Sequence, residues 1–136
     1  MASTTERPDF SGVWEMNFEK SVMRGLAPKR ILMTIEHREP RLIQQVLLTN
    51  ADGTEQRMNF TFATDAETAN PVGGSVAQTR AWWEGTELVI ESKMKLPGRD
   101  VYYKDYWSIS GDGRTLTMAH HDDDLDGQIS VLEKNF

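Results

Sequence analysis

Two histidines and one aspartate stand on apolar strand faces of this chain, where their side chains could do acid–base chemistry. His37 follows Ile35 on one alternating run, and His120 follows Met118 on another. Asp105 lies between them in the sequence, on a run rich in tyrosine and tryptophan. A carboxylate beside an imidazole fixes the tautomer of the ring and raises its basicity. His37, Asp105 and His120 are therefore the candidate catalytic residues.

The runs that carry Asp105 and His120 are separated by a short glycine turn at 111–113. Strands joined by such a turn pair as a hairpin, so we expect the two side chains to lie within hydrogen-bonding reach. Buried polar groups without partners are costly, and these must pair with each other, with water or with a ligand. Three interpretations stay open: a structural polar network, orientation of a ligand, and catalysis.

The candidate ligand-binding residues share one property, an expected position on the inner faces of the strands. They are Trp14, Met33, His37, Phe60, Phe62, Arg80, Tyr103, Asp105, Trp107 and His120.

The run around Arg80 leaves its inner face undecided. Either residues 78, 80 and 82 or residues 79, 81 and 83 point inward, because both sets contain a tryptophan. An inward Arg80, or Tyr103, would stabilise negative charge developing in a reaction.

Three aspartates near the C-terminus have the spacing of calcium ligands. Asp122, Asp124 and Asp126 match the first positions of an EF-hand loop, and Glu133 matches its last. An EF-hand needs flanking helices, whereas both flanks here alternate as strands. On a strand Glu133 would lie roughly 20 Å from the turn, at about 3.3 Å per residue. An acidic hairpin turn is the preferred interpretation, with a calcium site of the three aspartates as the alternative; no other metal site is predicted.

Composition restricts the class of protein. The 136 residues suit one domain over 1–136, with a flexible N-terminal segment at 1–8. A net charge of −6 disfavours nucleic acids and anionic lipids as partners, and no apolar run is long enough to span a membrane. No cysteine is present, so no disulfide is expected. We expect a soluble protein, either cytoplasmic or exported with its signal removed.

Alternating runs separated by turns containing glycine or proline predict about nine strands. They cover 8–18, 30–38, 41–49, 54–64, 75–83, 86–96, 101–110, 114–121 and 128–134, with 65–74 expected as a loop. Short turns require antiparallel neighbours, and closure removes exposed sheet edges. The predicted fold is all-β, a single antiparallel up-and-down β-barrel of about 8–10 strands, with room for one small ligand.

The tripeptide Gly12-Val13-Trp14, at the start of the first strand, resembles the Gly-x-Trp of the lipocalins and the wider calycin group. In that group the indole ring plugs one end of the barrel. The segments that begin at Trp83 (Trp-Glu-Gly-Thr-Glu-Leu) and at Trp107 (Trp-Ser-Ile-Ser-Gly-Asp-Gly) resemble those of small bacterial lipocalin-like proteins of unassigned role. The resemblance implies a calycin-type barrel.

The predicted function is binding of a small, largely apolar molecule in the barrel cavity, without a cofactor. One alternative is a cavity enzyme of the lyase, isomerase or cyclase type, with a His/Asp acid–base pair. Another is a filled barrel that assembles with other proteins, a homodimer included, through outward aromatics. Those aromatics would be Tyr102, Tyr106 and either Trp82 or Trp83.

Overall fold

Ten antiparallel strands make up the described part of this protein. The computed structural model describes residues 7–23, 28–72, 74–122 and 127–135. The strands are β1 (Gly12–Met16), β2 (Arg30–Arg38), β3 (Arg41–Thr49), β4 (Glu55–Ala63), β5 (Thr68–Val72), β6 (Ser75–Glu84), β7 (Glu87–Leu96), β8 (Arg99–Ile109), β9 (Thr115–Asp122) and β10 (Gln128–Lys134).

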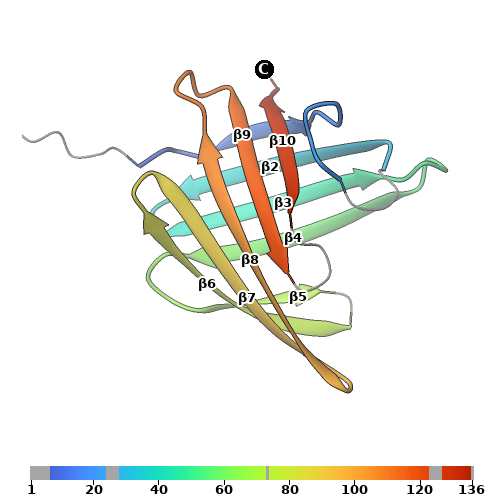
Figure 1. The fold of residues 1–136 in the computed structure, drawn as a ribbon, viewed down its shortest axis with the longest axis vertical. Coiled ribbons are helices and arrows are strands. Elements are labelled where there is room, and N and C mark those ends of the chain that lie inside the picture. Colours follow the sequence, from blue (N-terminus) through green and yellow to red (C-terminus); the bar gives the residue numbers. More distant parts are fainter. Residues whose placement is uncertain (1–6, 24–27, 73, 123–126, 136) are drawn as a thin grey trace, which may run out of the picture.

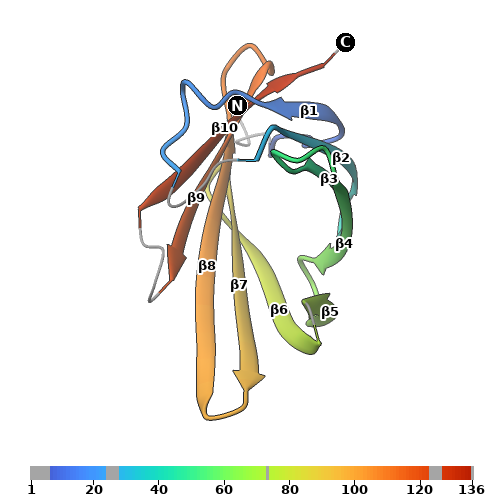
Figure 2. The same cartoon turned by 90° about the vertical axis from the view of Figure 1, so that its right-hand side faces the viewer.

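Strands that follow one another in the chain also pair in space, and β1 pairs with β10. The order across the sheet is therefore β4-β3-β2-β1-β10-β9-β8-β7-β6-β5. Figure 1 shows β7–β10 crossing in front of β1–β4, and the turned view of Figure 2 shows these two layers facing each other. The predicted up-and-down barrel is confirmed.

The structure has one strand more than the nine predicted. This strand, β5, lies where a loop was expected. Asn70-Pro71 has the composition of a turn, yet both residues belong to β5. β5 pairs with β6 and ends the sheet, so its other edge has no ladder to maintain. Proline is tolerated at such an edge because no backbone donor is needed there. The first strand is also shorter than predicted, beginning at Gly12.

β4 and β5 are the two ends of the sheet, and no backbone ladder joins them. The side chain of Asn70 on β5 bridges to the backbone of Thr61 on β4 instead. This amide closes the barrel at the point where backbone pairing stops.

The tryptophan of the Gly12-Val13-Trp14 tripeptide is fully buried in the hydrophobic core. Trp14 is 0% exposed and donates its indole N–H to the carbonyl oxygen of Phe10 at 2.9 Å. The ammonium of Lys134 lies 5.6 Å from the centre of its ring system. Leu88 and Leu116 are equally buried beside them. No helix able to span a membrane occurs within the described ranges.

Candidate functional site

The inner faces of β3 to β9 line a half-open cavity of about 210 Å³. Seven apolar or aromatic side chains and five polar ones line it. The lining residues are Gln44, Phe60, Phe62, Asn70, Val72, Thr79, Ile90, Ser92, Tyr103, Asp105, Trp107 and Met118.

Aromatic rings form one wall of the cavity. Phe60 and Phe62 stack on successive inner positions of β4, with ring centres 6.2 Å apart. Phe62 also packs edge-to-face against Trp107 of β8, with ring centres 5.8 Å apart. Because such rings pack in fixed mutual orientations, this wall is preformed.

A chain of polar side chains forms the opposite wall. Asn70 donates to the hydroxyl of Thr79 at 3.3 Å, and that hydroxyl lies 3.1 Å from the hydroxyl of Ser92. Tyr103 stands directly opposite Ser92 in the pair of β7 and β8. Burial raises the pKa of Tyr103, and nearby Asp105 adds to the rise. The phenol therefore stays protonated at neutral pH.

Asp105, which follows this chain on β8, pairs with His120 of β9. Nδ1 of His120 lies 2.6 Å from Oδ1 of Asp105, and Nε2 lies 2.7 Å from Oδ2 of Asp122. The predicted hairpin contact between Asp105 and His120 is confirmed. The register places the two residues directly opposite each other, which explains the short distance.

Two flanking carboxylates keep a proton on His120. The hydrogen bond to Asp105 raises the pKa of the imidazole from 6.5 to about 9; burial opposes the rise, and Asp122 adds to it. At neutral pH both ring N–H groups therefore donate.

His37 lies apart from this cluster, contrary to the prediction that both histidines line one cavity. Its Nδ1 accepts the backbone N–H of Phe10 at 3.1 Å, and its Nε2 lies 3.2 Å from Glu39. The ring stacks on Phe10 and Trp83, at 5.6 Å and 6.0 Å between centres. Phe10 packs in turn against Trp107, so these two rings separate His37 from the cavity. His37 belongs to this group of stacked rings.

The ten predicted ligand-binding residues divide evenly. Phe60, Phe62, Tyr103, Asp105 and Trp107 line the cavity. The other five, Trp14, Met33, His37, Arg80 and His120, lie outside the lining found among the described residues.

Arg80 is exposed, because Thr79 and Ala81 are the buried residues of that run. The set 79, 81 and 83 therefore points inward, and an oxyanion role of Arg80 in the cavity is wrong. Met33 contacts the cavity residue Gln44 through its sulfur.

Several polar residues of the site were not predicted from the sequence. Gln44 stands between Leu42 and Val46 on an inner face, so a polar residue in an apolar alternation was the available signal. Thr79 was one of two alternatives. Asn70 gave no signal, because its segment was taken for a loop.

The calcium interpretation rests on Asp124 and Asp126, which lie outside the described residues. Asp122 is described, as a partner of His120. Across 7–23, 28–72, 74–122 and 127–135, no group of three or more His, Cys, Asp or Glu residues is placed to hold a metal ion.

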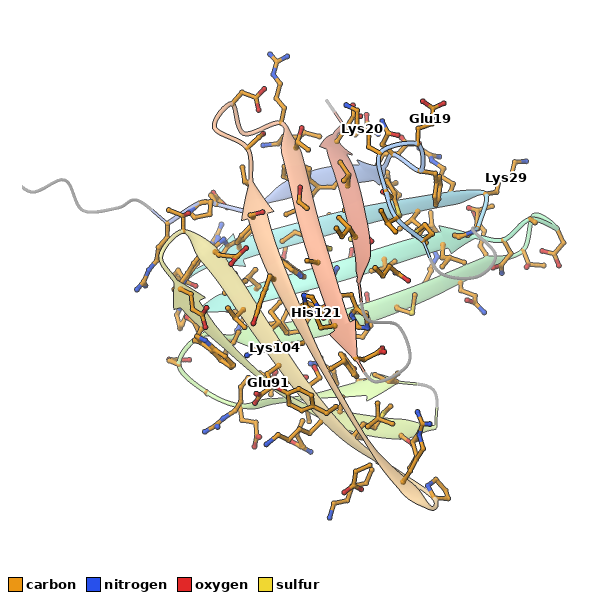
Figure 3. All side chains as sticks on the ribbon, in the orientation of Figure 1. Glu19, Lys20, Lys29, Glu91, Lys104 and His121 are labelled. Atoms are coloured by element: carbon orange, nitrogen blue, oxygen red, sulfur yellow. The ribbon has the colours of Figure 1, made fainter. Side chains whose placement is uncertain are left out.

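The outward aromatics form a second cluster, on the outer faces of β6–β9. Trp82 is the outward tryptophan of its pair. The ammonium of Lys104 lies 5.4 Å from the ring centre of Trp82 and 5.6 Å from that of Tyr106. Tyr106 also contacts His121, at 5.7 Å between ring centres. Figure 3 shows Lys104 and His121 side by side on this outer face, with Glu91 beside Lys104.

No family model matches the chain, and no curated protein does. Among solved structures, the barrel is similar to the crystal structure of secretory abundant heat soluble protein 4 from Ramazzottius varieornatus. The TM-score is 0.65 at 15% identity, covering 99% of this chain and 100% of that one. A second secretory abundant heat soluble protein of the same organism, crystallised from a dimer sample, gives 0.60 at 15% identity, covering 98% and 100%. The likeness shows the fold; kinship with bacterial lipocalin-like proteins stays a prediction.

Proposed function

We propose that this barrel binds a small, largely apolar molecule in the cavity lined by β3 to β9. The observation that carries the proposal is the lining itself. Aromatic and aliphatic side chains cover most of the cavity, and a few polar groups converge on it. Ligand pockets in proteins have this composition, in which apolar contacts give affinity and a few polar groups give orientation.

The size of the cavity restricts the ligand. An apolar cavity of about 150 Å³ accepts benzene. The volume of about 210 Å³ here suits one ring with a short substituent, or an aliphatic chain of similar bulk.

The geometry favours binding over catalysis. A general base must be unprotonated before it can accept a proton. His120 holds its proton at neutral pH and has both nitrogens engaged by carboxylates. In His37, the other candidate base, Nδ1 accepts a backbone N–H and Nε2 faces Glu39. Asp105 is the cavity residue of the predicted acid–base pair, and we assign it an orienting role.

Native mass spectrometry and thermal-shift screening against small apolar compounds test the proposal. We expect a retained mass or a rise in Tm with ring-sized compounds. Ile90→Phe should remove the effect, because Ile90 lines the cavity and a larger side chain fills it. The matched control is Ile129→Phe, at an exposed position on β10. If a ligand binds Ile90→Phe as tightly as it binds the native protein, its binding site lies elsewhere.

Assembly through the outer aromatics has less support. Trp82 and Tyr106 are both covered by Lys104, and Val89 beneath them is 0% exposed. A homodimer would appear as a concentration-dependent sedimentation coefficient that Trp82→Ala lowers to the monomer value. A constant monomer value would exclude it.

A further inference from the structure

Several hydrogen-bond donors of the cavity wall are already in use. Nδ2 of Asn70 donates to the carbonyl oxygen of Thr61 at 3.0 Å and to Thr79. The hydroxyls of Thr79 and Ser92 share a hydrogen bond at 3.1 Å. Behind the wall, both nitrogens of His120 are engaged. A ligand that needs strong donors from the protein finds few here.

Two residues of the cavity wall have an acceptor oxygen that makes no hydrogen bond to any described residue. Oδ1 of Asp105 binds His120, while its Oδ2 has no hydrogen-bond partner in the part of the chain that the structure describes. Gln44 is 6% exposed, and its amide makes one contact there, from Nε2 to the sulfur of Met33 at 3.2 Å. Its Oε1 has no described partner, and a thioether is a weak acceptor. Both residues line the cavity.

Among the described lining residues, the charged one is Asp105, a carboxylate. Asp105 lines the cavity and shares the imidazole of His120 with Asp122. The described cavity lining contains no lysine or arginine, because Arg80 points outward. A ligand carboxylate would therefore meet like charge without a cation, which is unfavourable in a partly buried site.

We propose that the cavity binds a small primary amine, whose ammonium group donates to Asp105 and Gln44 while its apolar body contacts the aromatic wall. This inference rests on the proposed function and specifies its ligand class. An ammonium brings three donors and one positive charge, which match the free acceptors and the carboxylate of Asp105 in the lining. The faces of aromatic rings also attract cations.

Three ligands that share one ring and differ in one group test the proposal: benzylamine, benzyl alcohol and benzoate. Isothermal titration of the full chain at neutral pH should rank benzylamine first and benzoate last. A hydrogen bond to a charged group contributes enough to make the amine about 10- to 100-fold tighter than benzoate. This ranking uses the unaltered protein, so it does not depend on the folding of a variant.

Asp105→Asn removes the charge and keeps the shape of the side chain. We expect it to abolish the advantage of benzylamine while benzyl alcohol still binds. Glu91→Gln is the charge-matched control, because Glu91 lies on the outer face of β7. There it accepts a hydrogen bond from the hydroxyl of Tyr102 at 2.7 Å. The control should retain the preference for the amine.

The outcomes separate this inference from the proposed function. If benzyl alcohol binds and benzylamine binds no more tightly than benzoate, the amine assignment is overturned while cavity binding stands. An amine preference that survives Asp105→Asn also overturns it. If none of the three compounds binds, the proposed function fails, and the amine assignment fails with it.

Discussion

Asn70 hydrogen-bonds both backbone groups of Thr61 across the one gap in the barrel. Its Oδ1 accepts the N–H of Thr61 at 2.7 Å, and its Nδ2 donates to the carbonyl oxygen of Thr61 at 3.0 Å. A carboxamide carries one acceptor and one donor side by side, so it satisfies both groups as a neighbouring strand would. Asn70 is 3% exposed and also lines the cavity, so closure of the barrel and shape of the site depend on one side chain.

Asn70→Ala should therefore destabilise the barrel by about 1–3 kcal/mol, because buried hydrogen bonds are lost and their partners left unsatisfied. Urea denaturation measures the free energy of unfolding. Amide hydrogen exchange at Thr61 should quicken specifically. Asn59→Ala, at an exposed position on β4, is the matched control. Unchanged exchange at Thr61 in Asn70→Ala would show that the gap closes by other contacts.

The ion-paired His120 makes stability depend on pH in a defined direction. Its pKa is about 9 in the folded protein and 6.5 without its partners. A group whose pKa is higher in the folded state stabilises that state. The stabilisation is full below the pKa of the unfolded state and is lost as pH rises through the pKa of the folded state. Between about pH 6 and about pH 10, the stability difference between the native protein and His120→Gln should shrink by up to about 3 kcal/mol.

Urea denaturation at the two pH values measures that difference. His121→Gln is the control, because His121 is the next residue on the same strand and is exposed. This variant keeps the contacts of His120 with Asp105 and Asp122, so it should not reproduce the loss seen in His120→Gln. A stability difference for His120→Gln that stays constant with pH would show that the imidazole is not held charged by its carboxylates.

Gly12 combines a backbone requirement with a close contact. Its φ is +140°, in the region that favours glycine, and an added Cβ would stand 2.9 Å from Cε of Lys134. Gly12→Ala should cost about 1–3 kcal/mol from backbone strain. Displacement of Lys134 should also change the fluorescence of Trp14, over which it lies. Gly111→Ala, where nothing lies within 4 Å of an added Cβ, should be close to neutral.

The strands could be predicted because period-2 alternation reports burial on one sheet face directly. The same logic, with a short glycine turn to set the register, predicted the contact between Asp105 and His120. β5 was missed because Pro71 signals a loop unless the edge position of its strand is known. Sheet order is a long-range property that local residue patterns do not contain.

The depth of a residue within the barrel could not be predicted either. Alternation placed His37 on an inner face correctly, but it does not tell how far along the barrel axis the residue lies. Phe10, which precedes the first strand, occupies the space between His37 and Trp107. A residue packed from outside the alternating pattern therefore removed His37 from the site.

The tryptophans give the most direct test of the cavity, because their indole N–H signals in a ¹H–¹⁵N NMR spectrum report on four different places. Trp107 lines the cavity, Trp14 is buried in the core, Trp83 stacks on Phe10, and Trp82 lies on the outer face. Titration with benzyl alcohol should shift the Trp107 signal in a saturable way and leave the Trp82 signal in place. A shift confined to Trp82, or no saturable shift at all, would contradict ligand binding inside the barrel.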